Sequence, residues 1–190
     1  MSELSVVLLI IVGLAVAAAL IVVLLYNKLV LLRNQVEAAW SQIDVQLRRR
    51  CDLIPNLVEV VKDYLSYEQE TLTRVIEARN SAVAARDQGR EASIAAEGML
   101  TAAMGKFFAL AESYPELRSN QNVADLQEEL STTENKIAFA RQHYNDSAMS
   151  LNTAVETFPS NLVAQRFGFD RSTYFEIPEE AREPVKVDLR

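Results

Sequence analysis

An uninterrupted apolar segment near the N-terminus constrains this chain more than any other feature of its sequence. Residues 4–26, from Leu4 to Tyr26, carry no charged side chain and consist mostly of Leu, Val, Ile and Ala. As an α-helix the segment is roughly 34 Å long, enough to cross a hydrocarbon core about 30 Å thick. The sequence therefore predicts a transmembrane anchor over residues 1–26, in contact with the lipid bilayer.

The flanks of this segment favour a permanent anchor over a cleaved signal peptide. The chain begins Met-Ser-Glu, with an acid where a signal peptide has basic residues, and the small residues lie inside the run. Gly13 and Ala17 are four residues apart, a spacing that lets two spans approach closely, although small residues are common in any span.

Basic residues lie on one side of the span only. Lys28 and Arg33 follow it, and Arg48, Arg49 and Arg50 come further on, whereas no Lys or Arg precedes it. Positive charge stays on the cytoplasmic side, which predicts an external N-terminus and a cytoplasmic domain. A single cysteine, which excludes an internal disulfide, agrees with that location.

Composition excludes several classes of function. A net charge of −7 disfavours nucleic-acid binding. One cysteine and one histidine cannot build the usual zinc clusters, and five glycines fall in no nucleotide-binding spacing. We therefore expect no cofactor and no metal.

Helical spacing continues beyond the membrane segment. No Gly or Pro occurs between Gly13 and Pro55, so we expect one helix from about residue 5 to about residue 50, with a break or kink at Pro55. Further helices are predicted at about 55–87, 91–114 and 120–157. The last of these has the clearest bundle seam, with apolar or small residues in alternating steps of three and four: Val123, Leu126, Leu130, Thr133, Ile137, Ala140, Tyr144, Ser147, Leu151, Ala154 and Phe158.

Long helices joined by short turns predict an all-α fold. The anchor helix would continue directly into an antiparallel helical bundle over residues 27–158. Residues 159–190, which directly follow Phe158, would form an aromatic, proline-containing tail with Phe167, Phe169 and Phe175. That tail either packs back irregularly to close the bundle or docks on another subunit or protein. Its last fifteen residues mix acids and bases and are expected to be solvated.

Polar residues occur on helices that otherwise have core spacing. They are either merely exposed or form an interhelical network that fixes register, within one chain or between chains. The candidate interaction residues are Trp40, Asp44, Arg49, Arg50, Asp52 and Asn56 near the first break, and Glu134, Asn135, Arg141 and Asn145 along the last long helix. Asp44 and Arg48 are spaced to pair on one helix.

The sequence shows no recognisable set of catalytic residues. His143 lies beside a bundle seam and is interpreted as a boundary polar residue. Cys51 follows three arginines that would lower its pKa, or it is simply packed. Acids at helical spacing, such as Asp125, Glu128 and Glu129, are most simply a solvated face. We therefore predict that the protein is not an enzyme.

Ordered stretches along nearly the whole chain resemble LemA-family proteins. They are Tyr26-Asn27-Lys28-Leu29-Val30, Ala39-Trp40-Ser41-Gln42-Ile43-Asp44, Asp52-Leu53-Ile54-Pro55-Asn56, Glu134-Asn135-Lys136-Ile137, Phe158-Pro159-Ser160-Asn161 and Phe167-Gly168-Phe169. The resemblance implies a bacterial single-pass inner-membrane protein with a helical bundle and no established enzyme activity. It associates the family with magnetosome membrane formation and with a membrane zinc protease of quality control.

Two functional hypotheses follow from the residues and the resemblance together. The first is a membrane-anchored scaffold that forms a homo-oligomer and organises or remodels the inner membrane. The second is an adaptor for another membrane protein, such as an envelope quality-control protease, bound through the tail or the arginine-rich segment near Pro55.

Overall fold

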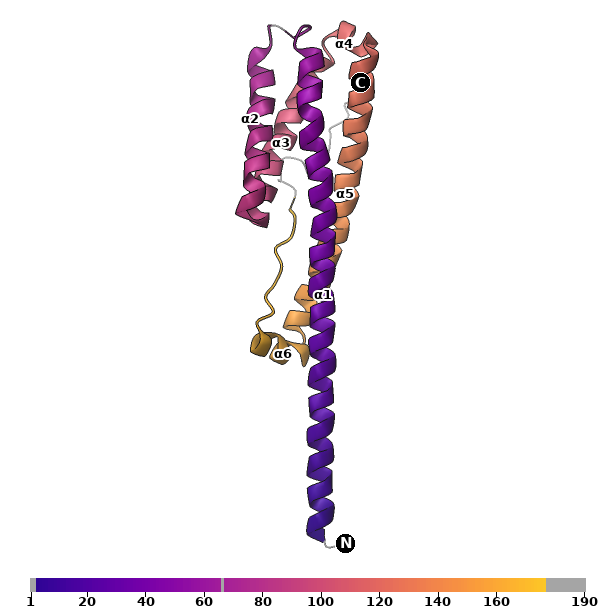
Figure 1. Cartoon of the computed structure of the whole chain (residues 1–190), viewed down its shortest axis with the longest axis vertical. Helices are drawn as coiled ribbons and strands as arrows, with labels where there is room; N and C mark the ends of the chain where they lie inside the picture. The colour runs from indigo at the N-terminus through magenta and orange to yellow at the C-terminus, as the bar shows by residue number, and fades with distance from the viewer. Residues whose placement is uncertain (1–2, 66, 177–190) are drawn as a thin grey trace, which may run out of the picture. The chain divides into compact units, whose positions relative to one another are not determined.

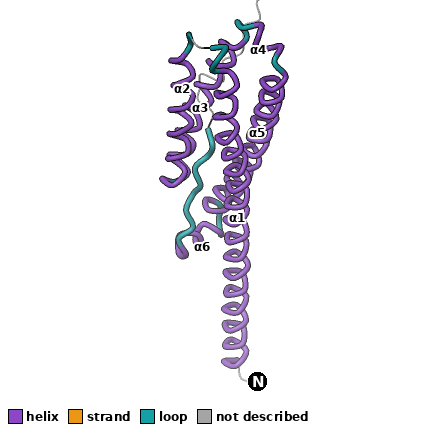
Figure 2. The backbone as a smooth tube through the Cα atoms, turned by 45° about the horizontal axis from the view of Figure 1, so that its top comes forward, coloured by secondary structure: helices purple, strands orange, loops and turns teal. Residues whose placement is uncertain are grey.

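The computed structural model describes residues 3–65 and 67–176, and the described residues form helices and no strand (Figure 1, Figure 2). The elements are α1 (Glu3–Val61), α2 (Gln69–Ala85), the 3₁₀ turn η1 (Arg86–Gln88), α3 (Arg90–Ala111), α4 (Pro115–Ser119), α5 (Gln121–Glu156) and α6 (Ser160–Phe167). The all-α fold expected from the sequence is confirmed, and its long apolar N-terminal helix is present.

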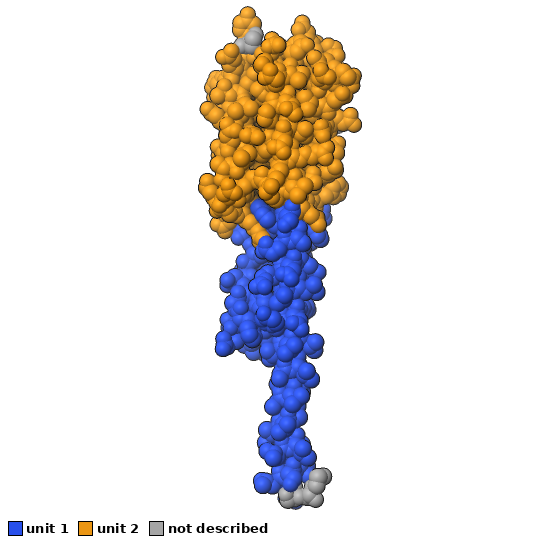
Figure 3. Space-filling view, viewed as in Figure 1, with its two compact units in different colours: residues 1–41, 142–174 blue, residues 42–141, 175–190 orange. Residues whose placement is uncertain are grey.

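The chain divides into two compact units (Figure 3). Unit 1 comprises Met1–Ser41 and Gln142–Tyr174, and unit 2 comprises Gln42–Arg141 and Phe175–Arg190. Each unit therefore contains part of α1 and part of α5.

Unit 1 carries the apolar segment. Every residue from Leu4 to Leu24 is exposed, as expected of a helix whose apolar side chains contact lipid. Beyond it, Leu29, Val36 and Ala39 of α1 lie in the interior, and α5 contributes buried residues at Tyr144, Ala148 and Leu151.

Unit 2 is an antiparallel helical bundle with its own core. α2 and α3 contact each other along their lengths, and Leu57, Leu100, Phe107 and Leu130 show that α1, α3 and α5 all contribute to one buried cluster. Among the described residues, α1 and α3 are both long and apolar enough to cross a membrane. In α3, however, one face is buried in this cluster through Ala96, Leu100, Met104 and Phe107, as in a core helix of a bundle.

The predicted break at Pro55 is wrong. Helix α1 runs through Pro55 to Val61. A proline inside a helix leaves the carbonyl four residues earlier without its donor, and that carbonyl belongs to Cys51. The Arg79 Nε of α2 donates a hydrogen bond to the Cys51 carbonyl oxygen at 3.0 Å. A side chain from the neighbouring helix thus replaces the missing backbone donor.

Other predicted boundaries also shift. The helix expected at 55–87 is instead the end of α1, a turn, and α2, while α3 and α5 lie close to their predicted ranges. The tail is not wholly irregular, because α6 forms within it. Gly168 ends α6 with φ +68°, and the Phe169 N–H donates to the Ala164 carbonyl at 3.0 Å. Residues 177–190, which make up almost all of the stretch expected to be solvated, lie outside the described residues.

Candidate functional site

A buried arginine forms the polar centre of unit 2. Arg50 of α1 is only 1% exposed, and its guanidinium reaches α3 and α5 at once. It pairs with the buried Glu97 carboxylate, with Glu134 Oε1 at 2.6 Å, and with Thr101 Oγ1 at 3.2 Å. One planar group with five donors therefore links three helices.

This Arg50 cluster is better suited to specifying the fold than to stabilising it. Within the described part of the chain, Arg50 Nε and Glu97 Oε1 make no hydrogen bond. A buried ion pair with unsatisfied atoms gains little over apolar residues of the same size, but it penalises any register that separates its partners.

Weaker ion pairs flank the cluster. Asp44 of α1 accepts from Arg86 Nε at 3.0 Å, which joins α1 to the turn η1 that follows α2, and it also pairs with Arg48 at 3.1 Å as the spacing predicted. Arg49 pairs with Glu129 of α5 at 2.5 Å, but both side chains are exposed by more than two fifths. Solvent screening leaves such a pair at most about 1 kcal/mol.

Two titratable groups near the cluster have shifted pKa values. Burial raises the pKa of the Cys51 thiol, and the nearby Arg50 and Arg79 only partly oppose that effect. The arginine-activated thiol considered from the sequence is therefore not what the structure shows. Burial also lowers the pKa of Arg141, whose guanidinium lies 4.6 Å from the ring centroid of Phe175.

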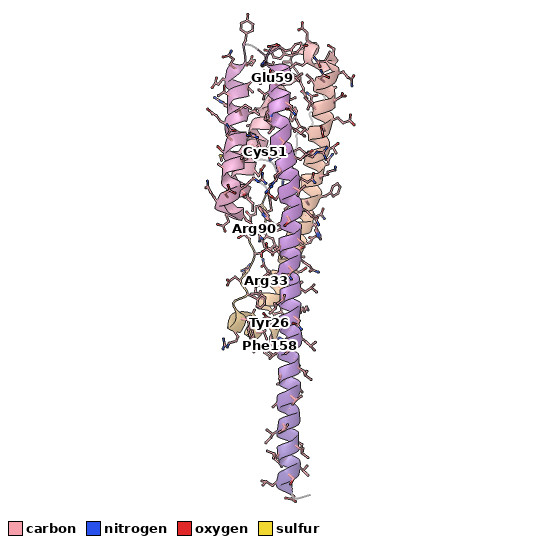
Figure 4. All side chains as sticks on the ribbon, in the orientation of Figure 1. Tyr26, Arg33, Cys51, Glu59, Arg90 and Phe158 are labelled. Atoms are coloured by element: carbon pink, nitrogen blue, oxygen red, sulfur yellow. The ribbon has the colours of Figure 1, made fainter. Side chains whose placement is uncertain are left out.

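Aromatic rings gather in unit 1 around the end of the apolar segment. The ring of Tyr26 lies edge-on to Phe167 at 5.0 Å and to Phe169 at 5.7 Å between centroids. The guanidinium of Arg33 lies 5.2 Å from the centroid of Phe169, which is buried. Figure 4 shows Tyr26 and Arg33 on α1 in this region.

The segment after α6 is fastened to α5 by hydrogen bonds. The buried Asn152 bonds Ser172 twice, accepting from its N–H at 2.8 Å and donating to its carbonyl at 3.0 Å. Tyr144, which packs edge-on against Trp40, donates its hydroxyl to the Thr173 carbonyl at 2.7 Å. These bonds hold the segment after α6 against α5 at Ser172 and Thr173.

The remaining candidate residues lie mostly at the surface. Asp52, Asn56 and Asn135 are exposed, and Asn145 is half-buried. Phe158, expected at the end of the α5 seam, is 75% exposed because α5 ends at Glu156. In the apolar segment, Gly13 has open space where a side chain would be, and Leu4 and Ala17 are exposed.

Sequence reasoning missed two residues that the structure makes central. Glu97 lies on the buried face of α3 with Ser93, Leu100 and Met104, a charge at core spacing that indicates a buried partner. Arg79 had no comparable signal, because its role depends on the carbonyl that Pro55 leaves free.

The side chains described above form structural contacts, and they do not form a recognisable catalytic or metal-binding arrangement. Within the residues described, no group of three or more His, Cys, Asp or Glu side chains is placed to hold a metal ion. His143 is exposed, and its backbone carbonyl accepts from the Ser147 hydroxyl at 2.8 Å. The raised pKa of the buried Cys51 keeps its thiol protonated, which does not suit a nucleophile.

Comparison with known proteins identifies the family. The model of the LemA family matches residues 39–189. The chain belongs to the LemA family. Magnetosome protein MamQ 2 of Paramagnetospirillum magneticum is 26% identical over 184 residues, which cover 84% of this chain and 68% of that protein. Magnetosome protein MamQ of Magnetospirillum gryphiswaldense is 25% identical, over 79% of this chain and 64% of its own length.

A relative outside the magnetosome proteins shows a similar match. Protein LemA of Metamycoplasma hominis is 26% identical over 162 residues, which cover 85% of this chain and 73% of that protein. None of these names is that of an enzyme. Together with the exposed apolar N-terminal part of α1, the relationship indicates a membrane-associated protein of the LemA family.

Proposed function

We propose that this LemA-family protein is a membrane-anchored helical scaffold that self-associates and organises or remodels the bacterial inner membrane. The proposed orientation has the N-terminus outside and the bundle in the cytoplasm, because the cations Lys28 and Arg33 closely follow the span.

The observation that carries this proposal is the absence of a linker between span and packed helix in unit 1. The apolar segment and the interior residues Leu29, Val36 and Ala39 belong to the same helix, α1. A tether for a soluble domain needs no such continuity. A scaffold does, because the orientation of the span is then tied to the orientation of the packed helices beside it.

The composition of the contacts supports a structural role. The Arg50 cluster fixes helix register in unit 2, and the paired hydrogen bonds of Asn152 fix the 168–174 segment in unit 1. Both are devices that specify a shape. The names of the MamQ relatives, which are magnetosome proteins, favour a role at a membrane.

Reconstitution of the full chain into vesicles tests the proposal. Cryo-electron tomography should show the protein in clusters or arrays, with vesicle curvature that differs from that of protein-free vesicles. A matched variant, Gly13→Leu, should disperse the clusters if spans pack through their small residues, while leaving the helical content unchanged. Evenly scattered single particles on vesicles of unaltered shape would contradict the proposal.

Crosslinking in native membranes separates the scaffold from the adaptor. The scaffold predicts crosslinks mainly between copies of this chain. Recovery of one dominant heterologous membrane protein, with few crosslinks between copies, would instead favour the adaptor function.

A further inference from the structure

Outside the apolar segment, exposed apolar side chains cluster at α6 and the turn that precedes it. Phe158, Leu162 and Phe167 are 75%, 57% and 52% exposed, within ten residues of sequence. Within α6, Val163 and Ala164 are buried, whereas Leu162 and Phe167 are more than half exposed. The helix is therefore held in place by buried side chains and still presents large apolar groups at the surface.

The depth of this apolar face is set by Tyr26. Tyr26 ends the apolar segment 4–26, and its ring lies 5.0 Å from that of Phe167. In the view of Figure 4, Phe158 and Tyr26 are labelled at a similar height along the axis of α1. Since the segment that ends at Tyr26 is about as long as the hydrocarbon core is thick, these rings lie at the level of the lipid headgroups.

The charges around α6 leave a small excess of cations. Lys28, Arg33 and Arg166 are exposed cations on this part of unit 1, and Asp170 is an exposed acid. Arg171 pairs with Glu156 at 3.0 Å. Large apolar rings flanked by a few exposed cations suit the boundary between lipid headgroups and acyl chains.

We propose that α6 and the Phe158–Pro159 turn are a second membrane contact, which inserts Phe158, Leu162 and Phe167 into the headgroup–acyl boundary of the bilayer that α1 crosses. The occupant of this face is lipid, because the face is continuous with the exposed apolar surface of the span through the Tyr26–Phe167 contact. Two contacts fix the rotation and depth of unit 1 in a way that a single span cannot.

Depth-dependent fluorescence quenching tests this proposal in the full chain. Leu162→Cys carries a bimane label in a Cys51→Ala background, and the protein is reconstituted into phosphatidylcholine vesicles that contain lipids with a nitroxide near the glycerol end of the acyl chain. His143→Cys is the matched control. His143 is exposed and neighbours Tyr144, which packs on Trp40, and Trp40 lies fourteen residues beyond Tyr26, about 21 Å further along α1.

The proposal predicts that nitroxide lipids quench the label at position 162 several-fold more than the label at position 143. Aqueous iodide should quench the two labels in the reverse order. Equal lipid quenching at both positions would overturn the proposal. A label at position 162 that neither lipid nor iodide quenches would also overturn the proposal if it becomes accessible to iodide when the protein is diluted in lipid. That result would identify a second copy of the chain, not lipid, as the occupant of this surface.

A second variant keeps the test independent of the labelled site. Phe158→Ser with Phe167→Ser should preserve the circular dichroism spectrum, since both side chains are exposed, and should reduce lipid quenching of the label at 162. Unchanged quenching would contradict the assigned anchors. A monomeric protein would still show the predicted quenching, so failure of the scaffold function and failure of the α6 contact are distinguishable.

Discussion

The hydrogen bond from Arg79 to the Cys51 carbonyl leads to a specific double-mutant prediction. In α1, Pro55 cannot donate to Cys51, and Arg79 of α2 supplies the donor at 3.0 Å. Arg79→Met removes that donor while it keeps most of the aliphatic stem. The substitution leaves a carbonyl of a buried residue without a partner.

The expected cost follows from the nature of the bond. Loss of a hydrogen bond from a charged donor to a buried acceptor costs about 1.5–3 kcal/mol of unfolding free energy. In a Pro55→Ala background the new backbone N–H at position 55 donates to Cys51 in the ordinary helical pattern. Arg79→Met should then cost much less, with a coupling energy of about 1–2 kcal/mol between the two positions.

Equilibrium unfolding in guanidinium chloride, followed by circular dichroism in detergent micelles, measures all four proteins of the cycle. Arg74→Met is the control on the same helix, because Arg74 is exposed and pairs with Glu70 one turn away. It should cost about 0.5 kcal/mol or less in either background. Additive effects of Arg79→Met and Pro55→Ala would refute the explanation of why α1 continues through the proline.

Three further predictions concern buried groups. Arg50→Met leaves the buried Glu97 carboxylate unpaired and should lower the free energy of unfolding by about 3–5 kcal/mol in denaturant titrations. Arg49→Met changes the neighbouring, exposed arginine and should lower it by less than about 1 kcal/mol. Equal losses would contradict the burial argument. Because burial raises the pKa of Cys51 above its ordinary 9.0, the thiol's contribution to stability is complete below that pH and is lost as pH rises through the raised pKa. Native protein should therefore react with a thiol reagent far more slowly than unfolded protein, and equal reaction rates would contradict this prediction. The free energy of unfolding, measured against pH, should fall at high pH more in the native sequence than in Cys51→Ala. Asn152→Ala removes two hydrogen bonds to Ser172 and should cost about 1–3 kcal/mol, with faster amide exchange at Ser172 but not in α2; unchanged exchange would show that these bonds do not fasten the segment.

Periodic spacing predicted the helices well where it was sustained. The α5 seam places Val123, Leu130, Ile137, Tyr144 and Leu151 in the interior, as the steps of three and four require. The seam fails at Phe158, where Pro159 has already ended the helix. A prediction from a long regular pattern tolerates one local exception, whereas the prediction for a residue at the end of a helix rests on that residue alone.

The errors arose where the outcome depends on tertiary partners. Pro55 is a helix breaker by local rules, and only the position of Arg79, on another helix, explains why α1 continues. The α6 helix is short and surrounded by proline and glycine, so its formation depends on burial of Val163 and Ala164. Local sequence propensity gives no information on either of these tertiary contacts.

The candidate interaction residues could be proposed as a set but not sorted by sequence. Arg49 and Arg50 are adjacent and identical in type, yet one is exposed and the other is fully buried. Helical phase alone distinguishes them, with Arg50 three residues beyond the buried Leu47 and four before Ile54. Its partner Glu97 was visible only as a charge at core spacing.

The mass of the complex in lipid tests the central claim most directly. Full-length protein is extracted from native membranes into polymer-bounded lipid discs and its mass is measured by native mass spectrometry. The scaffold account predicts particles that contain several copies of this chain. A single copy per disc at native expression levels, with or without a different protein bound to it, would contradict that account.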